Sequence, residues 1–154
     1  MNGPYVAVCG PSAATEDEAA WAVEIGRRLA EAGAVVVCGG LGGVMDAVAR
    51  GASGGGGTVI GILPGDTRSG ASPHLTVAIP TGMGEARNAL IARAADAVIA
   101  VGGEWGTLSE IALAMKMGTP VVGLSTWELS GRTDSLLRAE SPEDAVRLAL
   151  KHAG

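Results

Sequence analysis

The segment Gly102–Glu110, GGEWGTLSE, holds the residues of this chain whose types and spacing best suit the binding of an anion. It follows an apolar run at Ala97–Val101 and leads into a stretch whose pattern predicts a helix over Thr107–Met117. Glycines let a ligand approach the main chain, and the free N–H groups at a helix N-terminus bind anions. The Thr107 hydroxyl adds a further donor. The segment therefore predicts a phosphate site.

Three other apolar runs end in segments that carry glycine, namely Cys9–Ala13, Gly39–Met45 and Pro80–Asn88. None contains the Gly-Lys-Ser/Thr of a Walker A loop, and the first lacks the GxGxxG spacing of a dinucleotide-binding turn. One such loop serves only a turn about as often as it binds a ligand, but several at one sheet edge indicate a shared phosphate site. The candidate ligand-binding residues are Gly10, Ser12, Gly40, Gly43, Met45, Gly82, Asn88, Gly102, Gly103, Gly106 and Thr107.

Two charged residues, Arg87 and Glu110, lie close to these segments in the sequence. A guanidinium one turn into a helix that begins at the site can pair with a phosphate or a carboxylate. A carboxylate beside a phosphate costs Coulomb energy. In a functional interpretation, Glu110 offsets this cost because it bonds ribose hydroxyls or stabilises a cationic transition state. In the alternative interpretation, it only compensates the charge of a helix N-terminus. The residues alone leave both interpretations open.

The elements that position these residues alternate along the chain. We expect strands at Tyr5–Cys9, Ala34–Cys38, Thr58–Leu63, Leu75–Ile79, Ala97–Val101 and Pro120–Leu124. We expect helices over Glu16–Ala32, Val44–Ala52, Met83–Ala94 and Thr107–Met117, and a last one opened by Ser141 and Pro142. Thr15 with Glu18 three residues later forms a capping box, and Gly33 closes the first helix.

Strands that are apolar on both faces and separated by helices indicate a parallel sheet covered on both sides. The expected fold is therefore α/β, a Rossmann-like doubly wound parallel sheet in three layers, with residues 1–154 forming a single domain. In such sheets, ligands bind at the carboxyl ends of the strands where the strand order reverses. The glycine-containing segments all follow strands, so they are expected to meet at that edge.

Composition excludes several classes of protein. A formal net charge of −5, without any Phe and with one Tyr, argues against binding polymeric nucleic acid or an anionic membrane. The N-terminus lacks the features of a signal peptide and no apolar run reaches about 18 residues, so we expect a cytoplasmic protein. Cys9 and Cys38 read as small buried residues in a reducing compartment, and isolated His74 and His152 do not suggest a metal site.

The chain resembles the Lonely-guy superfamily of cytokinin riboside 5'-monophosphate phosphoribohydrolases, and within it the shorter molybdenum-cofactor-carrier-like branch. The resemblance covers residues 5–124 and rests on Arg87-Asn88-Ala89, Ala95-Asp96-Ala97 and GGEWGTLSE at matching spacing. The segment Gly39–Ala52, GGLGGVMDAVARGA, is also similar. Asn88 replaces the lysine usual in the family, and Gly102-Gly103-Glu104 replace Pro-Gly-Gly. The Arg-Asn form is the one that the carrier-like branch shows.

The resemblance implies that Gly103, Gly106 and Thr107 hold a phosphate and that Arg87 and Glu110 are a catalytic pair. The implied reaction is hydrolysis of the N-glycosidic bond of a nucleoside 5'-monophosphate, with no cofactor required. The alternative is a non-catalytic carrier of molybdenum cofactor. The family also implies a homodimer or larger homo-oligomer with Arg87 near the subunit boundary, which fits the apolar character of residues 44–52 and 83–94.

Overall fold

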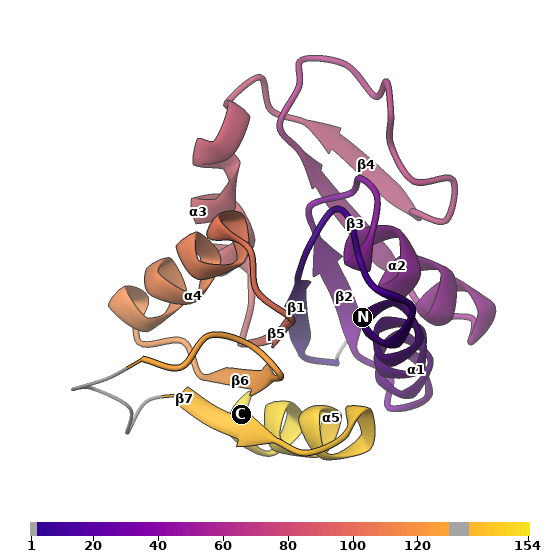
Figure 1. The fold of residues 1–154 in the computed structure, drawn as a ribbon. Helices are drawn as coiled ribbons and strands as arrows, with labels where there is room; N and C mark the ends of the chain where they lie inside the picture. The colour runs from indigo at the N-terminus through magenta and orange to yellow at the C-terminus, as the bar shows by residue number, and fades with distance from the viewer. Residues whose placement is uncertain (1–2, 130–135) are drawn as a thin grey trace.

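The computed structural model describes residues 3–129 and 136–154 and contains one parallel sheet of seven strands (Figure 1). Their order across the sheet is β4-β3-β2-β1-β5-β6-β7. The strands are β1 (Tyr5–Cys9), β2 (Val35–Cys38), β3 (Val59–Leu63), β4 (Val77–Pro80), β5 (Ala97–Val101), β6 (Val121–Leu124) and β7 (Leu136–Ala139). Residues of β1, β2, β5 and β6 are almost all buried, as expected for strands that are covered on both faces.

The helices form the two outer layers of the fold (Figure 1). They are α1 (Glu16–Glu31), α2 (Val44–Gly54), α3 (Asn88–Ala94), α4 (Trp105–Met117) and α5 (Pro142–His152). One buried cluster joins α1, α2 and α5 to one face of the sheet, and a second joins α3 and α4 to the other face. The predicted three-layer α/β architecture is therefore confirmed. None of the helices in the described residues is long and apolar enough to cross a membrane.

The helix caps read from the sequence are present in the structure. The backbone N–H of Glu18 donates to Thr15 Oγ1 at 3.1 Å, and the Glu18 carboxylate accepts from the N–H of Thr15 at 2.9 Å. Ser141 Oγ accepts from the N–H of Asp144 at 3.0 Å, and Pro142 occupies the first turn of α5. These bonds satisfy N–H groups that a helix N-terminus leaves free, so they fix where α1 and α5 begin.

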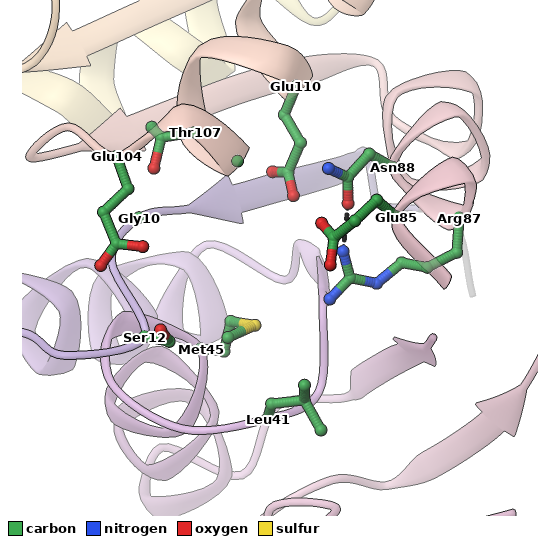
Figure 2. Close-up of a pocket in the computed structure, with 11 residues that line it drawn as sticks. Gly10, Ser12, Leu41, Met45, Glu85, Arg87, Asn88, Glu104, Thr107 and Glu110 are labelled. Carbon is green, nitrogen blue, oxygen red and sulfur yellow. Dashed lines mark hydrogen bonds between the residues drawn. The ribbon is translucent and has the colours of Figure 1, made fainter. Parts of the chain in front are cut away.

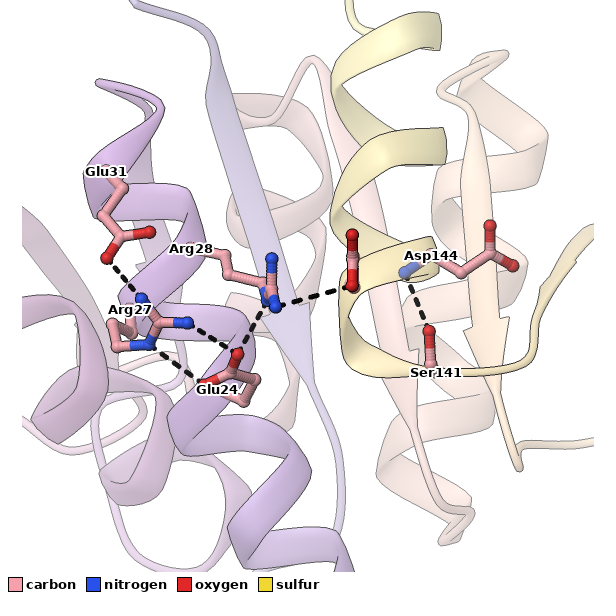
Figure 3. A network of polar contacts seen from close by, with 7 residues as sticks. Glu24, Arg27, Arg28, Glu31, Ser141 and Asp144 are labelled. Atoms are coloured by element: carbon pink, nitrogen blue, oxygen red, sulfur yellow. Dashed lines mark hydrogen bonds and ion pairs between the residues drawn. The ribbon is translucent and has the colours of Figure 1, made fainter.

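Exposed ion pairs join the surfaces of α1 and α5 (Figure 3). Glu24 binds both Arg27 and Arg28 on α1, and Arg28 reaches Glu143 on α5 at 3.5 Å. Because water surrounds these side chains, the pairs contribute little to stability. The position of α5 therefore depends on the buried Ala145, Val146 and Ala149 that α5 packs against the sheet.

The structure differs from the expected elements in several places. β4 begins at Val77 rather than Leu75, because Leu75 turns inward against Gly61, and Thr76 bonds the backbone of Val59 through its hydroxyl. The helix expected over Met83–Ala94 is a 3-10 turn, η1 (Gly84–Arg87), followed by α3. β7 was not expected, since its four residues, Leu-Leu-Arg-Ala, form only a short run that Arg138 interrupts.

Helices α1 and α2 pack so closely that glycine is required at their contact. A Cβ on Gly26 of α1 would lie 2.2 Å from the carbonyl oxygen of Val48, and one on Gly51 of α2 would lie 2.0 Å from that of Val23. The apolar residues of α2 are buried in this contact and against the sheet. Their apolar character is therefore explained within one subunit, contrary to the expectation that they mark a subunit interface.

We predict that Gly51→Ala lowers the free energy of unfolding by about 2 kcal/mol, although alanine is the better helix former, because the added methyl group forces the two helices apart. Gly54→Ala, in the same helix, is the matched control. A Cβ at Gly54 would meet nothing within 4 Å, so this variant should be neutral or up to about 1 kcal/mol more stable. Urea denaturation measures both, and equal effects of the two substitutions would contradict the packing argument.

Candidate functional site

A cavity of about 220 Å³ opens at the carboxyl ends of β1, β2, β4 and β5 (Figure 2). It lies where β1 pairs with β2 on one side and with β5 on the other, so that the chain winds away from it in both directions. This is the switch point at which open α/β sheets bind ligands. The cavity is lined by Gly10, Ser12, Leu41, Met45, Glu85, Arg87, Asn88, Glu104, Gly106, Thr107 and Glu110.

The loops after β1 and β2 cross at the base of the cavity. The N–H of Val44 donates to the carbonyl of Pro11 at 3.0 Å. Gly43, with φ of +64°, passes so close that a Cβ would lie 2.2 Å from the Pro11 oxygen. A Cβ on Gly10 would meet the Val101 carbonyl oxygen at 2.5 Å. These glycines therefore allow two loops and a neighbouring strand to meet, which places Ser12 and Met45 on one wall.

The N-terminus of α4 forms the opposite wall of the cavity (Figure 2). The helix begins at Trp105, two residues before the start expected from the sequence, and the side chain of its N-cap residue, Glu104, makes no capping hydrogen bond. N–H groups of its first turn are thus free to bind a ligand. A Cβ on Gly106 would meet no atom within 4 Å, so the approach to these groups is open. Thr107 Oγ1 is buried here without a hydrogen-bond partner.

Glu110 lies one turn further along α4 and is 8% exposed. Its Oε2 is buried and has no hydrogen-bond partner. Burial raises the pKa of Glu110 to about 7, opposed by the Cys9 thiol and the Arg87 guanidinium and assisted by Glu85. A carboxylate that only balanced the charge of the helix would be better placed in water. The burial of Glu110 therefore favours the functional interpretation of this residue.

The Cys9 thiol adjoins Glu110 at the end of β1. Burial raises the pKa of Cys9 well above its usual value, and the nearby Glu110 raises it further. The thiol therefore stays protonated next to the carboxyl group. Within residues 3–129 and 136–154, no three His, Cys, Asp or Glu side chains form a group that could hold a metal ion.

Arg87 reaches the cavity from the junction of η1 and α3 and is buried. Its Nε donates to the carbonyl of Ile62 at 2.9 Å, and its Nη1 donates to Oδ1 of Asn88. Arg87 and Asn88 line the cavity together with Glu110, as Figure 2 shows. The segments that follow β4 and β5 thus bring a guanidinium and a carboxyl group to one cavity with the open end of α4.

Most of the residues proposed from the sequence come together in the structure. Eight line the cavity: Gly10, Ser12, Met45, Arg87, Asn88, Gly106, Thr107 and Glu110. Five lie outside its lining: Gly40, Gly43, Gly82, Gly102 and Gly103. A catalytic or ligand-binding role stays a prediction for all of these residues, those in the lining and those outside it. Three further residues that line the cavity were not predicted from the sequence: Leu41, Glu85 and Glu104. Each lies next to a glycine, and the prediction of these loops rested on the glycines.

The burial of Glu110 predicts a pH-dependent loss of stability. In the unfolded chain its carboxyl group ionises near 4.5, but in the folded protein it ionises at about 7. Between these values the unfolded chain binds fewer protons, so the free energy of unfolding falls as pH rises. We expect a loss of about 3 kcal/mol between about pH 4 and pH 8 relative to Glu110→Gln, which has no group to ionise. Denaturant titrations of both proteins across this range measure the difference; parallel curves would contradict the assignment.

Comparison with known proteins places this geometry in a family. The model of the SLOG cluster4 family matches residues 3–149. The molybdenum cofactor binding protein of Rippkaea orientalis is 36% identical and superposes with a TM-score of 0.90 over 96% of both chains. The molybdenum cofactor carrier protein of Chlamydomonas reinhardtii is 34% identical, with a TM-score of 0.86 over 94% of this chain and 95% of that one.

A second kind of relative is the probable cytokinin riboside 5'-monophosphate phosphoribohydrolase LOGL5 of rice, Oryza sativa subsp. japonica. It is 39% identical over 97 residues, which are 58% of this chain and 38% of the rice protein. The resemblance inferred from the sequence motifs is therefore confirmed. The chain belongs to the SLOG cluster4 family, within the Lonely-guy superfamily and its molybdenum-cofactor-carrier-like branch.

Proposed function

We propose that the cavity binds a phosphorylated small molecule of the nucleoside monophosphate type and hydrolyses its N-glycosidic bond. The observation that carries this proposal is the pair of buried polar atoms without partners, Thr107 Oγ1 and Glu110 Oε2, at the uncapped start of α4. Buried polar atoms are nearly always bonded, so two unpartnered ones on residues that line one cavity favour a ligand that supplies the missing bonds.

The phosphate would be bound mainly by uncharged groups. Among the residues that the structure describes, Glu85, Glu104 and Glu110 line the cavity with Arg87 as the one cation, so acidic side chains outnumber the guanidinium by three to one. Free N–H groups of the first turn of α4 attract an anion without a side-chain charge, and Thr107 adds a hydroxyl donor. With the phosphate at this end, the sugar extends toward Glu110 and Arg87.

The proposed reaction places Glu110 beside the sugar carbon that carries the base. As the bond from this carbon to the base nitrogen breaks, positive charge develops on the sugar, and the carboxylate stabilises it. A water molecule then adds its hydroxyl to the carbon, and its proton ends on the released base. Arg87 positions the substrate. The products are a free base and ribose 5-phosphate, and no cofactor is needed.

Carriage of molybdenum cofactor is the second candidate function. It is favoured by the similarity of this chain, over nearly its whole length, to proteins named for binding or carrying that cofactor. Asn88, which stands in place of the lysine of the hydrolases, points the same way. Molybdenum cofactor would be the cargo here, with its phosphate at the start of α4, as proposed for the nucleotide. The two functions share one site and differ in whether Glu110 acts on a transition state.

We predict that Glu110→Gln lowers kcat for nucleoside monophosphate hydrolysis by about 100-fold or more, because the charge that stabilises the transition state is lost. Affinity for the nucleotide should stay the same or rise, since one carboxylate no longer repels the phosphate. Wild-type kcat/KM should rise with pH through about 7, as Glu110 of the free enzyme loses its proton. Release of free base from a panel of purine and pyrimidine monophosphates provides the measurement.

The matched control for this experiment is Glu104→Gln. Glu104 lines the same cavity but is exposed, so its removal changes the charge near the phosphate without touching the buried carboxyl group. It should leave kcat within about twofold of the wild type. Turnover that survives Glu110→Gln would refute the catalytic role of that residue. A wild-type protein without turnover on any monophosphate would favour the carrier function.

Assembly with a second copy of the chain is part of this proposal. Val77 and Ile79 on the edge strand β4, Met83 before η1 and Leu90 on α3 are 41–45% exposed. These four residues, the β4–α3 patch, lie in the segment that carries Arg87. The cavity of about 220 Å³ is also smaller than the roughly 300 Å³ at the lower end of ligand pockets. A second subunit on the β4–α3 patch would bury apolar surface and enlarge the site.

We predict a particle of at least twice the 15.2 kDa chain mass in light scattering at micromolar concentration. Leu90→Lys should shift the protein toward the single-chain mass without unfolding it, because Leu90 is exposed on α3. Lys151→Ala on α5, away from the β4–α3 patch, is the control and should leave the mass unchanged. A wild-type mass near 15 kDa contradicts the proposed assembly.

A further inference from the structure

The guanidinium of Arg87 is held by two oxygen atoms that carry no charge. One is the backbone carbonyl of Ile62, which accepts from Nε at 2.9 Å, and the other is Oδ1 of Asn88, which accepts from Nη1 (Figure 2). Arg87 is 6% exposed and Asn88 is 1% exposed. No ion pair of the described residues involves Arg87. A buried cation is therefore fully positioned without a carboxylate partner.

Arg87 and Asn88 are consecutive residues at the junction of two helices. Arg87 is the last residue of the 3-10 turn η1, and Asn88 is the first residue of α3. Both have right-handed helical backbone, with φ of −62° at Arg87 and −58° at Asn88. The hydrogen bond between their side chains is therefore a local contact at this junction.

The remaining donors of Arg87 face the cavity. A guanidinium has five N–H donors. Nε bonds Ile62 and Nη1 bonds Asn88, so neither bond uses the donors of Nη2. Nη2 lies above Gly39, where an added Cβ would come within 2.7 Å of it, and the Sδ of Met45 lies 2.5 Å from the same point. Gly39 therefore makes room for a guanidinium that is fixed beside the cavity.

Neutral acceptors satisfy the hydrogen bonds of a buried cation but do not cancel its charge, whereas a carboxylate would do both. We propose that Asn88 is a positioning residue that fixes the Arg87 guanidinium toward the cavity and leaves its positive charge for the anionic group of the ligand. This inference rests on the proposed function, because it assumes that a phosphorylated ligand enters the cavity. It also gives a defined place to Arg87, which lines the cavity together with Glu85, Glu104 and Glu110.

Two substitutions separate the position of Arg87 from its charge. Asn88→Asp keeps the shape and the acceptor oxygen but places a negative charge on the guanidinium. Asn88→Ala removes the acceptor. With AMP as the probe in isothermal titration calorimetry, each should weaken binding by about tenfold or more. A merely structural role of Asn88 would leave the isosteric Asn88→Asp variant with wild-type affinity, and circular dichroism confirms that both variants are folded.

The effect of Asn88→Ala must pass through Arg87, which a double-mutant cycle tests. In an Arg87→Ala background, the same Asn88→Ala substitution should change AMP affinity by less than about twofold. An equal loss of affinity in both backgrounds overturns the proposal. Wild-type affinity of the Asn88→Asp variant for AMP also overturns the proposal.

The guanidinium itself supplies a readout that needs no ligand. In protein labelled with ¹⁵N-arginine, Arg87 should give separate Nη1 and Nη2 signals in the wild type and in Asn88→Asp, because rotation is restricted. In Asn88→Ala the two signals should merge. Signals that are already merged in the wild type overturn the proposal. If the wild type binds neither AMP nor inorganic phosphate, the proposed function fails, and the Arg87 signals then decide on the role of Asn88 independently.

Discussion

The winding of the sheet reverses at β1, and the position of every group in the cavity depends on this reversal. β1 pairs with β2 on one side and with β5 on the other, so the chain leaves their carboxyl ends toward opposite faces of the sheet. Helix α2 follows on one face and α4 on the other. Gly10 lies at the centre of this divergence, where a Cβ would meet both Val101 and Val44. A cavity at this point is a consequence of the topology, and the loops decide its chemistry.

Two buried ionisable side chains share this cavity without pairing. Arg87 bonds only neutral oxygens, and Glu110 has an oxygen with no partner at all. Both arrangements cost free energy, since a buried charge is stabilised best by an opposite charge or is replaced by an apolar residue. Sequences conflict with such stability rules mainly at functional sites. The unpaired state keeps both groups available for a ligand and maintains the raised pKa of Glu110.

The sequence predicts the framework of the site better than its full lining. Arg87 and Glu110 could be brought together from the sequence, because each follows a strand and parallel strands end at one edge of the sheet. Glu85 and Glu104 could not, since an exposed glutamate next to a glycine looks like any solvated residue until the loops are folded. The strand at Leu136–Ala139 was also not predicted, because its apolar run is short and interrupted by Arg138, and its pairing with β6 depends on tertiary contact.

The close contact of α1 and α2 makes the two sides of the cavity mechanically unequal. With glycines at Gly26 and Gly51, the backbones of these helices touch, and the loops after β1 and β2 are tied to each other through Pro11. That side is packed backbone against backbone. The wall that carries Arg87 consists of a four-residue turn and the seven-residue α3, a smaller unit with an exposed outer surface. A displacement of this smaller unit would meet less packing than a displacement of α1 and α2, although it would have to break the bond from Arg87 Nε to the Ile62 carbonyl.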